Sequence, residues 1–170
     1  MTIIFLLAAL GAAALVLVAR RPATFRVQRS THIAASPEAI RPLISDLRRF
    51  NTWNPYANNR PLQLSYSGPD SGPGAAYAFS AGRSGGSVAV LDSAPEKVTM
   101  RLQMSGPVRC DHTLEFLLAP GVGGTEVTWA MHGRNGFLGK LMGLLCDTDR
   151  MVGRDFETGL AALKLQAEAS

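Results

Sequence analysis

The sequence predicts an α+β domain in which a curved antiparallel sheet of about seven strands wraps around one long C-terminal helix. Two short helices follow the first strand, and a transmembrane helix precedes it. Three observations lead to this prediction. Apolar and polar residues alternate through the middle of the chain, the periodicity becomes helical after Gly136, and the first residues are apolar and uncharged. Strand side chains repeat with period two, whereas one face of a helix recurs every three or four residues.

The N-terminal segment, residues 3–19, carries no charged or strongly polar side chain and ends before Arg20. As a helix it would span about 25 Å, the short end of what crosses a bilayer. A cleaved signal peptide is the alternative, but the chain lacks a basic start, and Leu17 stands where a small residue is preferred. We therefore predict a membrane anchor over residues 1–21 and one domain over residues 22–170. The positive-inside rule places this domain on the cytoplasmic side, whereas cleavage would export it.

The net charge of +4 lies beside this segment, in Arg20, Arg21, Arg26 and Arg29. The other thirteen Lys and Arg balance the thirteen Asp and Glu. Four arginines next to an apolar run are not the basic stripe of a nucleic-acid binder. The predicted partners are therefore a membrane and a small molecule, without nucleic acid. We expect Arg26 and Arg29 to add attraction to anionic lipid headgroups.

The first strand is predicted over residues 25–33, where apolar and polar side chains alternate. A short helix follows, because Ser36 can cap it and Pro37 suits its first position, where a missing N–H costs nothing. Asp46 can cap a second short helix over residues 47–53, which the next two residues, Asn and Pro, should end.

Further strands are predicted by the same alternation, with glycine-rich turns between them. They cover residues 62–67, 75–80, 87–92, 98–105, 109–118 and 126–132. On the fifth of the seven strands Val98, Met100 and Leu102 share one face, and on the sixth His112 shares a face with Phe116. The middle of the chain is therefore an antiparallel meander with one apolar and one polar face.

After Gly136 apolar residues recur at helical spacing from Phe137 to Leu163, with most charged residues opposite them. This pattern predicts one long amphipathic helix, with Asp147 and Asp149 near its middle on the solvated face. A sheet with one apolar face and a helix with one apolar stripe must bury those surfaces against each other.

Five motifs in this order resemble the START-related superfamily often labelled SRPBCC, and in particular its polyketide cyclase/dehydrase-like branch. The motifs are residues 25–30 followed by 36–38, then 50–56, 74–77, 124–131 and 153–160. Phe50 and Tyr56 stand where tryptophan is commoner in that branch. The resemblance covers roughly residues 25–165 and implies the helix-grip fold of the birch-pollen allergens, with a cavity for lipids, sterols or polyketides.

The resemblance implies that inward strand positions and the helix stripe line this cavity. The candidate ligand-binding residues are Trp53, Tyr77, Phe79, Met100, Leu102, Met104, His112, Leu114, Phe116, Trp129, Met131 and Phe156. Methionine is flexible and polarisable, which favours an adaptable pocket. The alternative is that these side chains fill the space themselves as an ordinary core.

His112 is the sharpest polar exception among these apolar strand positions, and Tyr77 adds a phenol. His112 could bind a ligand carbonyl or act as an acid or base near neutral pH, or a neighbouring group could satisfy it. Cys110 lies two residues away, about 7 Å at Cα, too far for a nucleophile–base pair. Cys110 and Cys146 form no C-x-x-C pair, and His32, His112 and His132 fall on separate strands. The sequence therefore predicts no catalytic residue, metal or cofactor.

These features favour a membrane-tethered carrier or sensor of a hydrophobic small molecule such as a lipid, sterol or polyketide. One alternative is an interaction module with a filled core and no ligand. A second alternative is a cyclase or dehydratase acting on a polyketide-like substrate, with His112 as its acid–base group.

Overall fold

The computed structural model describes residue 20 and the ranges 24–58, 62–106, 109–134 and 147–169. The predicted anchor over residues 3–19 and the first part of the predicted long helix lie outside these ranges. Within them, no helix has the length and apolar character that crossing a bilayer requires.

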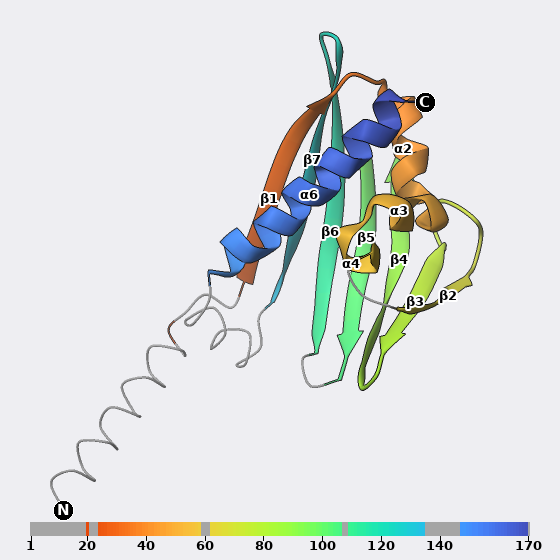
Figure 1. Ribbon diagram of the computed structural model, residues 1–170, viewed down its shortest axis with the longest axis vertical. Helices are drawn as coiled ribbons and strands as arrows, with labels where there is room; N and C mark the ends of the chain where they lie inside the picture. Colours follow the sequence, from red (N-terminus) through yellow and green to blue (C-terminus); the bar gives the residue numbers. More distant parts are fainter. Residues whose placement is uncertain (1–19, 21–23, 59–61, 107–108, 135–146, 170) are drawn as a thin grey trace, which may run out of the picture.

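A single antiparallel sheet of seven strands forms one layer of the domain, in the order β1-β7-β6-β5-β4-β3-β2 (Figure 1). Each consecutive pair from β2 to β7 is a neighbour in the sheet, and β1 closes the far edge against β7. The sequence therefore predicts the meander correctly. The strands are β1 (Thr24–Ile33), β2 (Gln63–Ser67), β3 (Ala76–Ala81), β4 (Ser84–Ala94), β5 (Lys97–Ser105), β6 (Cys110–Gly121) and β7 (Gly124–Arg134).

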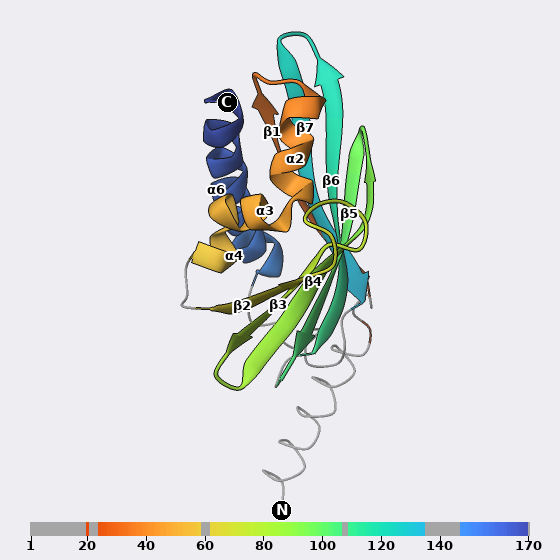
Figure 2. The ribbon, with the colours of Figure 1, turned by 90° about the vertical axis from the view of Figure 1, so that its right-hand side faces the viewer.

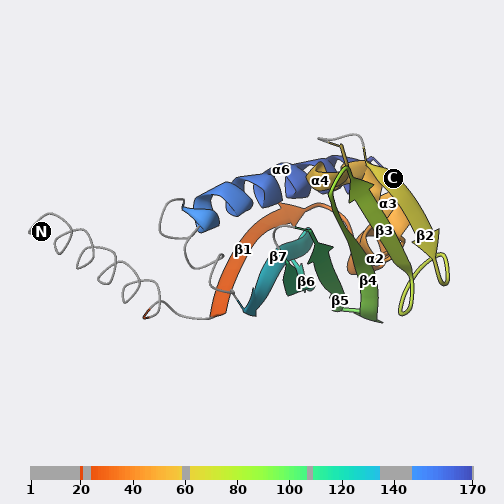
Figure 3. The same cartoon turned by 90° about the horizontal axis from the view of Figure 1, so that it is seen from below.

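The described helices all lie on one side of the sheet, which curves around them (Figures 2 and 3). They are α2 (Pro37–Ser45), α3 (Leu47–Trp53), α4 (Pro55–Asn58) and the long α6 (Thr148–Glu168). A sheet on one side and helices on the other leave one core between two layers, as the two amphipathic patterns require.

The predicted helix starts are partly confirmed. The Asp46 carboxylate accepts hydrogen bonds from the backbone N–H groups of Arg48 and Arg49, so it caps α3 as expected. Pro37 occupies the start of α2, but the Ser36 side chain makes no capping hydrogen bond. The chain also forms α4, a further short helix, where the sequence predicted only the end of α3.

The position of Asp147 in the long helix corrects the sequence prediction. Its side chain accepts a hydrogen bond from the backbone N–H of Arg150, so it is the N-cap of α6 rather than a mid-helix residue. Aspartate is favoured at this position because it satisfies a donor without an intrahelical partner, and Asp149 in the first turn suits the helix dipole. Continuous apolar periodicity across the boundary conceals such a start in the sequence.

The glycine-rich segment predicted as a turn before β4 is shorter than expected, since Gly85 and Gly86 belong to that strand. A Cβ on Gly86 would lie 2.6 Å from the ring of Phe79 and 2.3 Å from the carbonyl oxygen of Gln103. Glycine is therefore needed here for close approach of a neighbouring ring, not for a turn.

An aromatic cluster occupies the centre of the core and joins the sheet to α3 and α6. The rings of Trp129 on β7 and Phe156 on α6 stack with centroids 4.2 Å apart and planes at 6°. Trp53, Phe50 and Phe116 meet this pair and one another at centroid distances of 4.9–6.4 Å, mostly edge to face. All five side chains are fully buried, so the middle of the sheet is filled by protein.

Arg29 on β1 holds the N-terminal half of α6 against the sheet. Its guanidinium lies 3.0 Å from the carboxylate of Asp149 and 2.9 Å from that of Glu157, and passes beneath Gly153. The ion pair lowers the pKa of Asp149. The charge of Arg29 is therefore paired with two carboxylates of the same domain, and its attraction to lipid headgroups stays a prediction.

Gly159→Ala should destabilise the domain although alanine is the better helix former by about 1 kcal/mol. A Cβ at Gly159 would lie 2.7 Å from Cζ3 of Trp129 and 3.0 Å from Cδ of Pro55, both in buried residues. Overpacking costs about 1–3 kcal/mol, so we expect a net fall in the free energy of unfolding, measured by urea denaturation. The control is Ala161→Gly at an exposed site on α6, which measures the difference in helix propensity alone. A Gly159→Ala protein that is more stable than wild type would contradict the close packing at Gly159.

Candidate functional site

The apolar residues on the concave face fall into a buried group and a half-buried group. The half-buried group lies at the end of the sheet where β5 ends and β6 begins (Figure 1). Its members, which we call the apolar patch, are Phe25, Leu64, Phe79, Leu102, Met104 and Met131. Strand register places them in adjacent rows across the sheet. The patch is therefore continuous with the core but less covered by protein.

His112 stands in the middle of the patch. It pairs with Leu102 on one side and Gly133 on the other, and the Phe25 ring meets it edge to face at 4.7 Å. A Cβ on Gly133 would lie 2.5 Å from Cδ2 of His112, so the imidazole lies over that glycine. Its ring nitrogens bond to no described residue. Burial lowers the pKa of His112, against the opposing effect of Asp111, and so favours the neutral ring near pH 7.

Cys110 lies next to His112 along the same face, and it is half-buried. Burial raises the pKa of its thiol, so the thiol form dominates and the residue is a weak nucleophile. Cys146 lies outside the described residues. Within those residues, no three His, Cys, Asp or Glu side chains converge on a position that a metal ion could occupy.

A second polar group borders the patch where β2 and β3 meet α3. The Asn51 Nδ2 donates to the hydroxyl of Tyr66 at 3.1 Å, and the Asn54 Nδ2 donates to the Asn51 Oδ1 at 3.3 Å. Tyr77 lies across from Tyr66 with ring centroids 5.9 Å apart, and its hydroxyl interacts with Asn54. Burial, together with Tyr66, raises the pKa of Tyr77. We call these four residues the amide–phenol cluster.

Local backbone structure explains how two asparagines come to lie inside the domain. Asn51 lies in the last turn of α3, and Asn54 ends that helix, with its backbone N–H bonded to the Phe50 carbonyl at 2.9 Å. The Asn54 Oδ1 also accepts the backbone N–H of Tyr56 at 3.2 Å, which holds the start of α4. These asparagines are not among the site residues predicted from the sequence. A signal was present, because they are spaced three apart at the end of a helix whose other buried residues, Leu47, Phe50 and Trp53, are apolar or aromatic.

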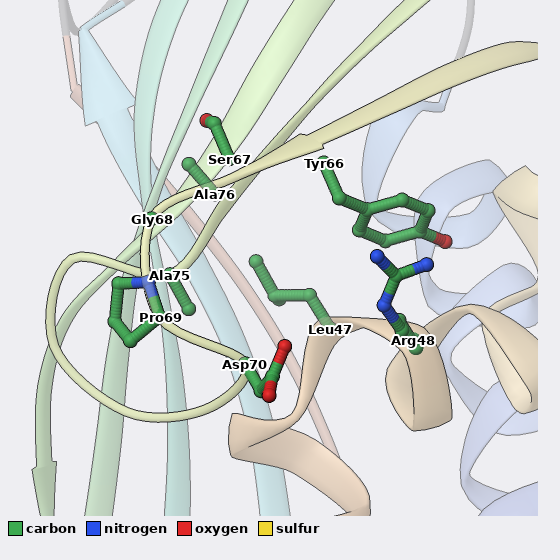
Figure 4. A pocket seen from close by; sticks show the side chains of 9 residues that line it. All are labelled: Leu47, Arg48, Tyr66, Ser67, Gly68, Pro69, Asp70, Ala75 and Ala76. Atoms are coloured by element: carbon green, nitrogen blue, oxygen red, sulfur yellow. The ribbon is translucent and has the colours of Figure 1, made fainter.

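A small pocket of about 60 Å³ lies beside this cluster, between the start of α3 and the loop after β2 (Figure 4). The guanidinium of Arg48 lies over the Tyr66 ring, 4.3 Å from its centroid. The residues that line the pocket are Leu47, Arg48, Tyr66, Ser67, Gly68, Pro69, Asp70, Ala75 and Ala76. This pocket holds a few water molecules at most, since sites for drug-sized ligands measure about 300–1,000 Å³.

The structure separates the twelve candidate ligand-binding residues into two sets. Seven lie in the buried core: Trp53, Tyr77, Met100, Leu114, Phe116, Trp129 and Phe156. The other five, Phe79, Leu102, Met104, His112 and Met131, lie together in or beside the apolar patch. Among the buried side-chain nitrogen and oxygen atoms of the described residues, only Trp129 Nε1 has no hydrogen-bond partner. Truncating a buried tryptophan costs about 3–5 kcal/mol in stability. Ligand binding is therefore best tested by substitutions in the five residues in or beside the apolar patch.

Comparison with known proteins identifies both a sequence family and a fold. Residues 24–168 match the profile of the family described as polyketide cyclase / dehydrase and lipid transport. Ara h 8.0201 superposes with a TM-score of 0.59 at 10% identity, over 86% of this chain and 99% of its own. Aha1 from Colwellia psychrerythraea, solved as a dimer, gives 0.56 at 20% identity, over 85% and 96%.

DynU16, a protein of the dynemicin biosynthetic locus, gives a TM-score of 0.57 at 17% identity over 84% of this chain. The chain spans 47% of the length of DynU16. At these identities the likeness shows the helix-grip fold alone. No curated protein sequence matches this chain significantly.

The lowered pKa of His112 predicts a pH-dependent stability. Because burial disfavours the charged ring, the unfolded chain binds this proton more readily than the folded one. The stability that the folded protein gains from keeping the His112 ring neutral is fully present above the ordinary pKa of 6.5. It declines as the pH falls below that value. The melting temperature should fall less between about pH 7.5 and about pH 5.5 for His112→Gln than for wild type. His132→Gln, on the opposite face of the sheet, is the matched control, and an unchanged decline in His112→Gln would refute the assignment.

Proposed function

This chain belongs to the polyketide cyclase/dehydrase and lipid transport family, and from that membership we propose that its domain binds a hydrophobic small molecule against the apolar patch. The domain would then act as a carrier or sensor of a lipid, sterol or polyketide-like compound. The family description supports a hydrophobic ligand as a class but does not specify one.

The observation that carries this proposal is the half-buried state of the patch. Its side chains are neither withdrawn into the core nor replaced by polar residues, although they lie on a curved face beside it. A ligand covering them gains about 0.8 kcal/mol for each buried CH₂ group. Part of that gain offsets the loss of translational and side-chain freedom on binding.

Carrier or sensor activity accounts for the patch with fewer assumptions than catalysis. Arg29 is neutralised by two carboxylates, and burial keeps the Cys110 thiol protonated. His112 is the one group on the described concave face whose unperturbed pKa lies near neutrality. An enzyme would need further groups positioned around it.

A cyclase or dehydratase is the second candidate, and the position of His112 favours it. The ring lies in the patch, and its nitrogens have no partner among the described residues. Turnover of a polyketide-like substrate that is lost in His112→Gln would favour this candidate over a carrier.

We further propose that residues 3–19 tether the domain to the cytoplasmic face of a membrane. The apolar run and the adjacent arginines support this proposal. In a bacterial host, the full-length chain should fractionate with membranes, and a chain lacking residues 1–21 should not. Protease added outside spheroplasts should leave the domain intact. Cleavage of the domain from outside, or release of a shortened chain, would contradict the tether or its orientation.

Leu102→Asn should weaken binding of a hydrophobic probe by the full-length protein. The substitution puts an amide into the patch, and Leu102 is only half-buried, so we expect a fold-preserving loss of about tenfold or more in affinity. Fluorescence titration with N-phenyl-1-naphthylamine measures it. Leu91→Asn, on the neighbouring strand with 53% of the leucine exposed, is the matched control. Equal probe affinity in wild type, Leu102→Asn and Leu91→Asn would favour an interaction module with no ligand.

A further inference from the structure

The amide–phenol cluster directly adjoins the apolar patch. Tyr66 pairs with Tyr77 across β2 and β3, and the next pair on the same face is Leu64 with Phe79, both in the patch. Alternate residues of a strand point to the same face, so the two phenols and the two apolar side chains form a continuous surface. A ligand that contacts Leu64 and Phe79 therefore lies beside the next cross-strand pair, which is the two tyrosines.

The hydrogen bonds inside the cluster leave the hydroxyl proton of Tyr66 unused. Asn54 donates to Asn51, Asn51 donates to the Tyr66 oxygen, and the Asn54 oxygen accepts the backbone N–H of Tyr56. The Tyr66 hydroxyl thus receives a hydrogen bond, but no described residue accepts its own proton. A phenol has one O–H to donate, and hydrogen bonds arranged in a chain polarise one another. The chain of bonds therefore ends in a donor at the border of the patch.

The surroundings of this donor favour an uncharged acceptor. Tyr77 and Asn54 are at most 4% exposed, and burial of an ionised group away from water is costly unless it is paired. Among the described residues, Arg48 places its guanidinium over the face of the Tyr66 ring, but Arg48 is itself exposed, so solvent screens its charge. A carbonyl or ether oxygen needs no counter-charge and can accept the hydrogen bond of the phenol.

We propose that the Tyr66 hydroxyl donates a hydrogen bond to a carbonyl or ether oxygen of the ligand, with Asn51 and Asn54 as positioning residues. The ligand is then an uncharged, mainly apolar molecule with one such oxygen near an end of its apolar part. This inference rests on the proposed function, because it assumes that the apolar patch holds the remainder of the molecule.

The test compares ligands of equal length on the full-length protein. Undecan-2-one, undecane and undecanoate each displace N-phenyl-1-naphthylamine from wild type, Tyr66→Phe and Tyr56→Phe. Tyr66→Phe should weaken binding of the ketone by about two- to tenfold, the effect of one hydrogen bond, and leave undecane unchanged. Tyr56→Phe removes a phenol that interacts with Asp155 on α6, outside the cluster. It should change neither the affinity for the ketone nor the affinity for undecane. Asn51→Ser should reduce the ketone's advantage over undecane in the same direction as Tyr66→Phe.

A second measurement needs no variant. The carbonyl stretch of bound undecan-2-one should lie at a lower wavenumber than in heptane, because a donated hydrogen bond weakens the C=O bond. A stretch equal to that in heptane, or equal losses of ketone and undecane in Tyr66→Phe, would overturn this inference and leave the proposed function standing. If Tyr66→Phe weakened the binding of undecanoate more than that of the other two compounds, the inference that the acceptor is uncharged would be overturned. Failure of every compound to bind would overturn the proposed function, and this inference with it.

Discussion

The stacking of Trp129 on Phe156 is the contact on which the arrangement of this domain depends. Trp129 stands on β7, which is hydrogen-bonded to β1 and β6 on its two sides, and Phe156 lies in the first half of α6. Gly159 allows the helix to approach the indole closely, and Trp53 from α3 meets it edge to face. Because close-packed rings cannot slide without opening space, this contact determines where α6 crosses the sheet.

The crossing of α6 in turn decides which part of the concave face is fully buried. Arg29 binds Asp149 and Glu157 and fixes the N-terminal half of the helix over β1. At the other end, the backbone N–H of Ala34 donates to the carboxylate of Glu168 at 2.8 Å. Between these attachments the helix covers the aromatic cluster, while Leu102 and Met104 lie farther along β5 and stay half-buried. A packed core and a half-buried apolar patch are thus two consequences of the same helix position.

One short segment serves both stability and the proposed recognition. Residues 50–55 supply two rings of the aromatic cluster and both asparagines of the amide–phenol cluster. The Trp53 indole also donates to the Leu43 carbonyl at 2.8 Å, which ties α3 to α2. Rings packed this tightly hold the amides in place, so the donor at Tyr66 is oriented before any ligand arrives. Preorganisation of this kind lowers the free-energy cost of ordering polar groups on binding.

The sequence by itself determined the types and order of the strands and of α2, α3 and α6, because period-two and helical patterns and side-chain caps are local properties; it did not indicate α4. The alternation of Val98, Met100 and Leu102 and the cap at Asp46 could be recognised without a fold. The start of α6 at Asp147 could not, since apolar periodicity continues past it.

Only the tertiary structure decided which inward residues form core and which form a candidate site. Phe116 and His112 lie on the same face of one strand, yet the first is buried beneath aromatic neighbours and the second is half-buried in the patch. Asn51 likewise acquires its role from Tyr66, fifteen residues along the chain on a different element. Burial and hydrogen bonding are set by elements distant in sequence, so local patterns place a side chain on a face but do not show what covers it.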